Sequence, residues 1–120
     1  MILTDQNYVD KAEQVIDKLS KTRDFSKLTT SQIRKILSLT SALYDLARMK
    51  PYENLVQKVS YLRVQIAYQS GRQPVVKQFV DSAQLLEALK EVHDKDSLIL
   101  FCRYMEALVA YFKFNGGKEN

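Results

Sequence analysis

The sequence predicts an all-α fold, a compact bundle of five to six helices that forms one domain over residues 1–120. In each long segment apolar residues recur at intervals of three and four, and no segment shows the alternation of apolar and polar residues that marks a half-buried strand. Only three glycines and two prolines interrupt the chain, which favours long helices. A chain of 120 residues, 46% of them hydrophobic, can bury a core without disulfides or bound metal.

The first helix is expected near the start of the chain. Thr4 or Asp5 can cap it, because both side chains accept hydrogen bonds from free N–H groups of a first helical turn. Its apolar period ends between Lys18 and Lys21. Residues 20–28 lack a clear period and predict a loop.

The second and third helices are separated by a proline. Thr29 can cap the second helix, with Gln32 at the third helical position returning the hydrogen bond. Pro51 ends this helix and is expected to open the third, because proline breaks the hydrogen-bond ladder but fits a first turn. Gly71 is expected to end the third helix as a left-handed C-cap.

A fourth helical region begins at Pro74 and continues to about Val92. Polar residues at 81–82 are expected to interrupt it and divide it into two short helices. A polar turn then precedes the last helix, for which Asp94, Asp96 or Ser97 can supply the cap.

The last helix extends to Asn115 and stops at the glycines 116–117. It carries two apolar stripes, and its aromatic-rich second stripe is made of Leu100, Tyr104, Ala107, Tyr111 and Phe114. So much apolar surface needs two neighbours, either within the bundle or on another subunit. We favour the interpretation that this is the central helix of the bundle.

Catalytic, metal-binding and cofactor-binding residues are not predicted. The single Cys102 cannot form an internal disulfide or a multi-thiolate site, and its place on an apolar stripe indicates a core thiol. The single His93 lies among acids near the end of a helix, where it can contact terminal carbonyl groups. Neither zinc-ligand spacing nor a glycine-rich phosphate loop is present. The sequence therefore favours a binding protein over an enzyme.

Charge is segregated along the chain. Residues 21–77 hold eleven Lys/Arg and three Asp/Glu, a net charge of +8, whereas residues 1–20 and 78–120 each have a net charge of −2. A positive field of this kind attracts a polyanion such as RNA. A solvated basic surface of a stable domain would show the same composition, so charge alone does not decide between the two.

The third helix combines a packing face with a polar face that lacks carboxylates. If the second and third helices pack antiparallel, cations from both can converge on one surface with the amides and phenols of the third. The residues that we expect to contact RNA are Arg34, Lys35, Arg48, Lys50, Lys58, Tyr61, Arg63, Gln65, Gln69, Arg72 and Lys77. Lys58, Tyr61 and Arg72 share a face that Arg34 and Arg48 are expected to complete. Arg63 projects elsewhere and either pairs with an acid or serves a second edge.

Three segments resemble a known family. They read Ser-Gln-Ile-Arg at 31–34, Tyr-Leu-Arg-Val-Gln-Ile-Ala-Tyr-Gln-Ser-Gly-Arg at 61–72, and Phe-Cys-Arg-Tyr-Met-Glu-Ala-Leu-Val-Ala-Tyr-Phe-Lys at 101–113. In order and spacing they are similar to the small helical subunit of the type III-A CRISPR-Cas effector, the Csm complex. The resemblance spans nearly the whole chain and consists of packing and surface motifs.

The resemblance implies a non-catalytic, cytoplasmic subunit of an RNA-guided antiviral complex. Its expected partners are target RNA, guide CRISPR RNA, the backbone and large subunits of the effector, and further copies of itself, with no membrane involved. In that family the backbone subunit cuts target RNA, and the large subunit cleaves DNA and makes cyclic oligoadenylate. The positions that match the family's basic surface best are Arg34, Lys35, Arg63 and Arg72.

One alternative stays open at the level of sequence. A helical adaptor could bind an acidic protein partner through the basic segment and use the aromatic stripe of the last helix as an interface. Dependence of binding on RNA distinguishes this adaptor from an RNA-binding subunit.

Overall fold

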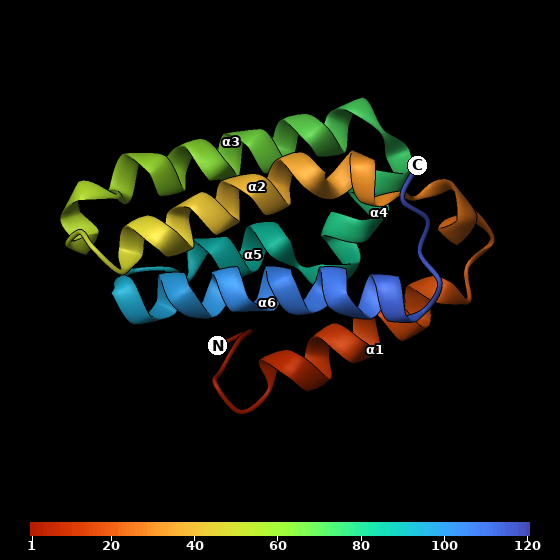
Figure 1. Cartoon of the computed structure of the whole chain (residues 1–120), viewed down its shortest axis with the longest axis horizontal. Helices are drawn as coiled ribbons and strands as arrows, with labels where there is room; N and C mark the ends of the chain where they lie inside the picture. The colour runs from red at the N-terminus through yellow and green to blue at the C-terminus, as the bar shows by residue number, and fades with distance from the viewer.

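The computed structural model describes residues 1–120 and consists of helices joined by short connections. Its α-helices are α1 (Tyr8–Ser20), α2 (Thr30–Ala47), α3 (Val56–Arg72), α4 (Pro74–Ala83), α5 (Leu85–Lys90) and α6 (Lys95–Phe114). Two 3-10 helices, η1 (Arg23–Lys27) and η2 (Tyr52–Asn54), precede α2 and α3 (Figure 1). The predicted all-α class with five to six helices is confirmed. No helix combines the length and the hydropathy that crossing a bilayer requires.

Helix α6 lies at the centre of the bundle. It packs against both α1 and α2 (Figure 1). Its buried residues are Leu98, Phe101, Cys102, Tyr104, Met105, Leu108 and Phe112. The Tyr104 hydroxyl donates to the Ala83 carbonyl oxygen at 2.9 Å, which ties α6 to the end of α4. The central-helix interpretation is therefore correct, and Phe114 is the one member of the aromatic stripe that is fully exposed.

Two of the long helices, α2 and α6, each begin with a capping box. Thr29 accepts from the Gln32 N–H, and the Gln32 side chain accepts from the Thr29 N–H at 2.8 Å. Asp94 and Ser97 form the same reciprocal pair at the start of α6. The hydrogen bonds from Ser97 hold the pKa of Asp94 below its usual value. Both caps lie where the sequence predicts them.

Two expected helix ends are wrong. Pro51 does not open α3, because residues 52–54 first form the 3-10 helix η2 and α3 begins at Val56. Gly71 has no positive φ and lies inside α3, which ends one residue later. The physical reason is Pro74, which disfavours helical geometry at the residue before it, so Gln73 is extended and α3 stops.

The break between α4 and α5 is real, but it lies beyond the expected residues 81–82. Gln84 adopts a left-handed conformation with φ 56°, and the chain turns there. The loop expected over residues 20–28 contains the short helix η1. The first helix begins at Tyr8. Thr4, one of the two expected caps, caps the turn that leads into it, because its hydroxyl oxygen accepts from the Asn7 N–H and the Asn7 side chain accepts from the Thr4 N–H.

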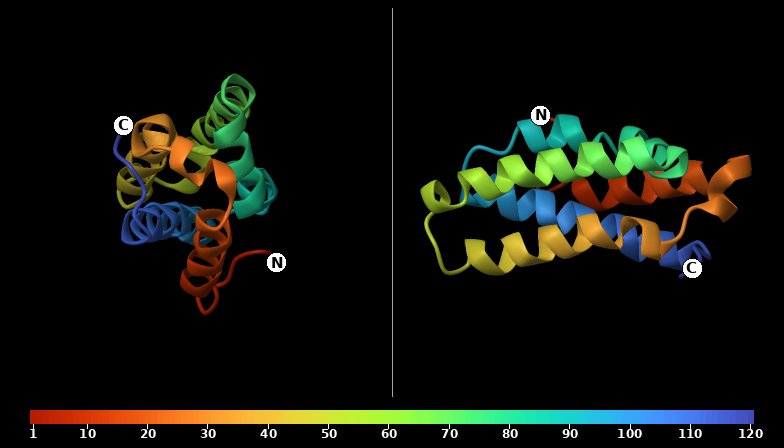
Figure 2. Two further views of the ribbon diagram at one scale, coloured as in Figure 1. Left: turned by 90° about the vertical axis from the view of Figure 1, so that its right-hand side faces the viewer. Right: turned by 90° about the horizontal axis from the view of Figure 1, so that it is seen from above.

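Helices α2 and α3 lie side by side and antiparallel along the 42 Å long axis of the molecule (Figures 1 and 2). Residues 116–120, here called the tail, leave α6 and run to the start of α2 (Figure 2). The tail pairs with α2 through an isolated parallel bridge between Thr29 and Lys118. The tail thus lies at the end of the α2–α3 pair where α2 starts, and not at the end where α2 leads into α3.

Candidate nucleic-acid interface

All of the predicted cations except Arg63, which lies in the middle of α3, gather at the two ends of the antiparallel α2–α3 pair. The turn end, where α2 leads into α3, carries Arg48, Lys50 and Lys58. The tail end, where α2 starts and α3 finishes, carries Arg34, Lys35, Arg72 and Lys77. Fourteen residues separate the first and last cations of each helix, a distance of about 21 Å at about 1.5 Å per residue. The cations therefore form two groups and not one continuous patch.

Most of these cations have no acidic partner within the chain. Lys35, Arg48, Lys50, Lys58, Arg63 and Arg72 are exposed and take part in none of the six ion pairs. Arg34 lies 3.7 Å from Glu119, and Lys77 lies 2.8 Å from Asp81 on the same helix. Exposed, unpaired cations keep their charge available to an external anion.

Aromatic and amide side chains occupy the stretch of α3 between the two cationic ends. Tyr61 and Tyr68 are 53% and 57% exposed, so neither belongs to the core. The Gln65 amide donates to the Tyr61 hydroxyl at 3.0 Å, and the Arg72 guanidinium lies 5.7 Å from the centre of the Tyr68 ring. Rings that are held in place and open to solvent can stack on bases, and arginine can add cation–π attraction.

Arg63 lies on the opposite flank of α3 from Tyr61, Gln65 and Arg72. Its side chain is exposed and forms no ion pair. The alternative of a structural arginine paired with an acid is therefore wrong. Arg63 faces a second edge of α3.

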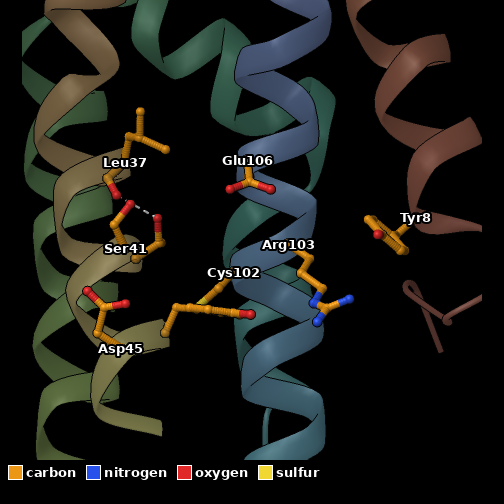
Figure 3. Close-up of a pocket in the computed structure, with 9 residues that line it drawn as sticks. Tyr8, Leu37, Ser41, Asp45, Cys102, Arg103 and Glu106 are labelled. Carbon is orange, nitrogen blue, oxygen red and sulfur yellow. Dashed lines mark hydrogen bonds between the residues drawn. The ribbon is translucent and has the colours of Figure 1, made fainter. Parts of the chain in front are cut away.

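The flank of α2 that carries Arg34 turns towards α6. Ser41 and Asp45 share that flank at helical spacing, and both line a groove against α6 (Figure 3). Arg34 itself meets Glu119 in the tail that follows α6. Arg48 shares this flank at helical spacing. The expectation that Arg34 and Arg48 complete the polar face of α3 is therefore wrong, because their flank of α2 faces α6 and not α3.

The groove between α1, α2 and α6 has a volume of about 500 Å³. Its lining residues are Tyr8, Leu37, Thr40, Ser41, Tyr44, Asp45, Cys102, Arg103 and Glu106 (Figure 3). Hydrogen bonding to the phenol of Tyr44, and then to that of Tyr8, raises the pKa of Arg103. Asp45 and Glu106 face the same space, so the groove carries charges of both signs.

The tail holds a carboxylate between two cations from different helices. Glu119 Oε2 lies 3.7 Å from Arg34 of α2, and Glu119 Oε1 pairs with Lys113 of α6. The hydrogen bond and charge of Lys113, with a smaller contribution from Arg34, hold the pKa of Glu119 below its usual value. Neither Lys113 nor Glu119 could be predicted as a site residue from the sequence, since their approach to Arg34 depends on the path of the tail.

The sequence matches a family of known proteins. A model of the Csm2 type III-A family matches residues 4–118. The chain belongs to the Csm2 type III-A family. The expected membership in the Csm proteins of type III-A CRISPR systems is confirmed.

Individual members of the Csm2 family align over most or all of their length. Three of them are called CRISPR system Cms protein Csm2. The protein of Streptococcus thermophilus is 59% identical over 119 residues, which cover 98% of each chain. The protein of Mycobacterium tuberculosis is 47% identical over 124 aligned positions and covers 99% of each chain. That of Enterococcus italicus is 35% identical over 101 residues, 75% of this chain and 69% of its own.

Cys102 and His93 are the single cysteine and the single histidine of this Csm2 chain. Cys102 is buried on α6, and burial raises the pKa of its thiol to about 12. His93 Nδ1 lies 3.0 Å from the Glu91 carbonyl oxygen, and its Nε2 lies 3.5 Å from Asp94. Both positions agree with the structural interpretations drawn from the sequence. No three potential metal ligands come together.

Proposed function

We propose that this Csm2 chain is a non-catalytic subunit of the type III-A CRISPR effector that holds the target RNA and guide RNA duplex through contacts to the sugar-phosphate backbone. Residues 1–120 act as one domain, stack with further copies of the chain and contact the backbone and large subunits of the effector. The lone buried thiol supports a reducing, cytoplasmic location.

One observation carries this proposal: six exposed cations without acidic partners lie along α2 and α3. Helix α3 has no carboxylate at all and presents Tyr61 and Tyr68 between its cations. Cations of this kind bind phosphate groups without reading sequence, while phenol rings stack on any base. Sequence-independent binding suits a subunit that must accept whatever duplex the guide specifies.

The salt dependence of target binding tests this proposal. Effector complexes that carry Lys58→Ala with Arg72→Ala should bind a complementary target RNA more weakly than wild-type complexes do. The slope of log affinity against log salt should fall in magnitude by about 1.4 for each copy of the chain in the complex, since each lost phosphate contact to the single target strand removes about 0.7. Binding can be measured by fluorescence anisotropy over a series of KCl concentrations.

The matched control is Lys18→Ala with Lys90→Ala. These lysines are exposed, form no ion pair and lie on α1 and α5, so their removal changes net charge equally without touching the α2–α3 pair. Equal affinity and slope for the two double variants would contradict the proposal.

A second candidate function rests on a different observation. Tyr61, Val64 and Tyr68 form an exposed apolar row on α3 at 53–59% exposure, which is also what a protein-docking helix presents. An adaptor of this kind would bind an acidic protein through the neighbouring cations. Co-purification with protein partners that survives nuclease treatment, together with a flat salt dependence for RNA, would favour the adaptor.

A further inference from the structure

The tail is held on α2 by its backbone. The N–H groups of Thr30 and Ser31 donate to the carbonyl oxygens of Lys118 and Glu119 at 2.9 and 3.0 Å. The Ser31 hydroxyl donates to the Glu119 carbonyl oxygen at 2.8 Å. These bonds do not involve the Glu119 carboxylate, so the path of the tail does not depend on that charge.

Two glycines bring the tail to this position. Gly116 has φ 88°, a left-handed conformation that lets the chain turn away from α6. Gly117 donates its N–H to the Phe112 carbonyl oxygen at 2.8 Å, and a Cβ at this residue would overlap the Phe112 ring. The reversal therefore directs the chain back over the last turn of α6, where Lys113 lies.

The Glu119 carboxylate is the sole ion-pair partner of both Arg34 and Lys113. Each cation faces a different carboxylate oxygen. The side chain of Arg34 is 61% exposed, that of Lys113 is 40% exposed and that of Glu119 is 54% exposed. The group is therefore open to solvent. An exposed ion pair is stabilised only weakly, by about 0 to 1 kcal/mol, and an external anion can replace one partner.

We propose that Arg34 and Lys113 form a binding site for a phosphodiester group of RNA, which the Glu119 carboxylate occupies until the nucleic acid displaces it. This site rests on the proposed function. A phosphodiester presents two oxygens and one negative charge, as the carboxylate does, and arginine binds such paired oxygens well. The first N–H groups of α2 are already used by tail carbonyls, so the site consists of the two side chains.

The proposal adds Lys113 to the interface and gives the tail a role in setting affinity. Binding at this site must displace the carboxylate, whereas binding at the unpaired Lys58 or Arg72 displaces no side chain. Removing the carboxylate should therefore tighten RNA binding. Glu119→Gln keeps the side-chain size and the backbone hydrogen bonds of the tail.

The test compares effector complexes that carry Glu119→Gln, Lys113→Gln or the control Glu13→Gln, with a target RNA complementary to the guide as the probe. Glu13 is exposed on α1 and has no ion pair, so its variant reports the effect of net charge alone. Relative to this control, Glu119→Gln should bind about twofold to fivefold more tightly at low salt for each copy of the chain in the complex. Lys113→Gln should bind more weakly than wild type.

Failure of this site is distinguishable from failure of the proposed function. If Lys58→Ala with Arg72→Ala weakens RNA binding but Glu119→Gln behaves as Glu13→Gln does, the displaced-carboxylate site is wrong and the RNA-binding function stands. If neither set of variants changes RNA affinity, both are wrong. Thermal unfolding of the isolated full-length variants verifies that Glu119→Gln leaves the fold intact.

Discussion

At the scale of single residues, burial decides which of the chemically distinctive side chains can act. Cys102 is 5% exposed between core residues of α6, and its raised pKa keeps it as a thiol at neutral pH. The cations of α2 and α3 are exposed, and they keep their charge in contact with solvent. The residues to which we assign the proposed function are therefore exposed to solvent and not part of the core.

The reactivity of the Cys102 thiol tests whether this residue is buried in the core of the native protein. Burial disfavours the charged thiolate, so the thiolate population in the native protein rises only as the pH approaches about 12. We expect iodoacetamide at mildly alkaline pH to leave native Cys102 unmodified and to label it rapidly in denaturant, as followed by intact mass spectrometry. The denatured sample is the control for reagent activity. Fast labelling of the native protein would contradict the assignment of a core thiol.

At the scale of elements, side-chain hydrogen bonds fix where α2 and α6 begin, while one strained residue divides α4 from α5. Gln84 is the only residue other than glycine with a positive φ. Its side chain accepts a hydrogen bond from Lys11 of α1 at 2.8 Å. The left-handed conformation costs a residue with a Cβ about 1 kcal/mol, and a β-branched residue more.

Two substitutions at Gln84 distinguish the effect of its left-handed backbone conformation on stability from the effect of losing its side-chain hydrogen bond. Both Gln84→Gly and Gln84→Val lose the bond from Lys11, but only valine adds branching at Cβ in the left-handed region. We expect Gln84→Val to be less stable than Gln84→Gly by about 1–2 kcal/mol in urea unfolding. Equal stabilities would show that the left-handed turn at this residue does not constrain its side chain.

The elements that the sequence predicted well are those set by nearby residues. The capping boxes at Thr29 and Asp94 depend on side chains three positions away, and the pattern of apolar residues identified the buried face of α6. The turn at Gln84 has no such signal, because glutamine is not typical of left-handed turns.

The candidate site was predictable only in part, for the same reason. The segregated charge indicated the exposed cations of α2 and α3, and helical spacing separated Arg63 from the face of Tyr61. The ion pairs of Glu119 with Arg34 and Lys113 depend on how the tail folds back from α6 to α2. Contacts between segments so distant in sequence follow from tertiary packing, which no local period encodes.

At the scale of the whole molecule, the antiparallel α2–α3 pair separates the positive charge into two ends. Lys58 belongs to the turn end and Arg72 to the tail end of the same helix, about 21 Å apart at about 1.5 Å per residue. Tyr61 and Tyr68 lie between them. A strand that follows α3 can contact both ends, with bases stacked on the rings along the way.

This arrangement predicts independent contributions from the two ends. In effector complexes, Lys58→Ala and Arg72→Ala should each weaken target binding and each lower the salt slope by about 0.7 per copy of the chain. Because the two sites are far apart and share no partner, their effects on binding free energy should add to within about 0.5 kcal/mol in a double-mutant cycle. A target RNA too short to bridge the two ends should respond to only one of the substitutions. A coupling energy well above that limit, or a long target that responds to only one substitution, would show that the strand does not follow α3 from end to end.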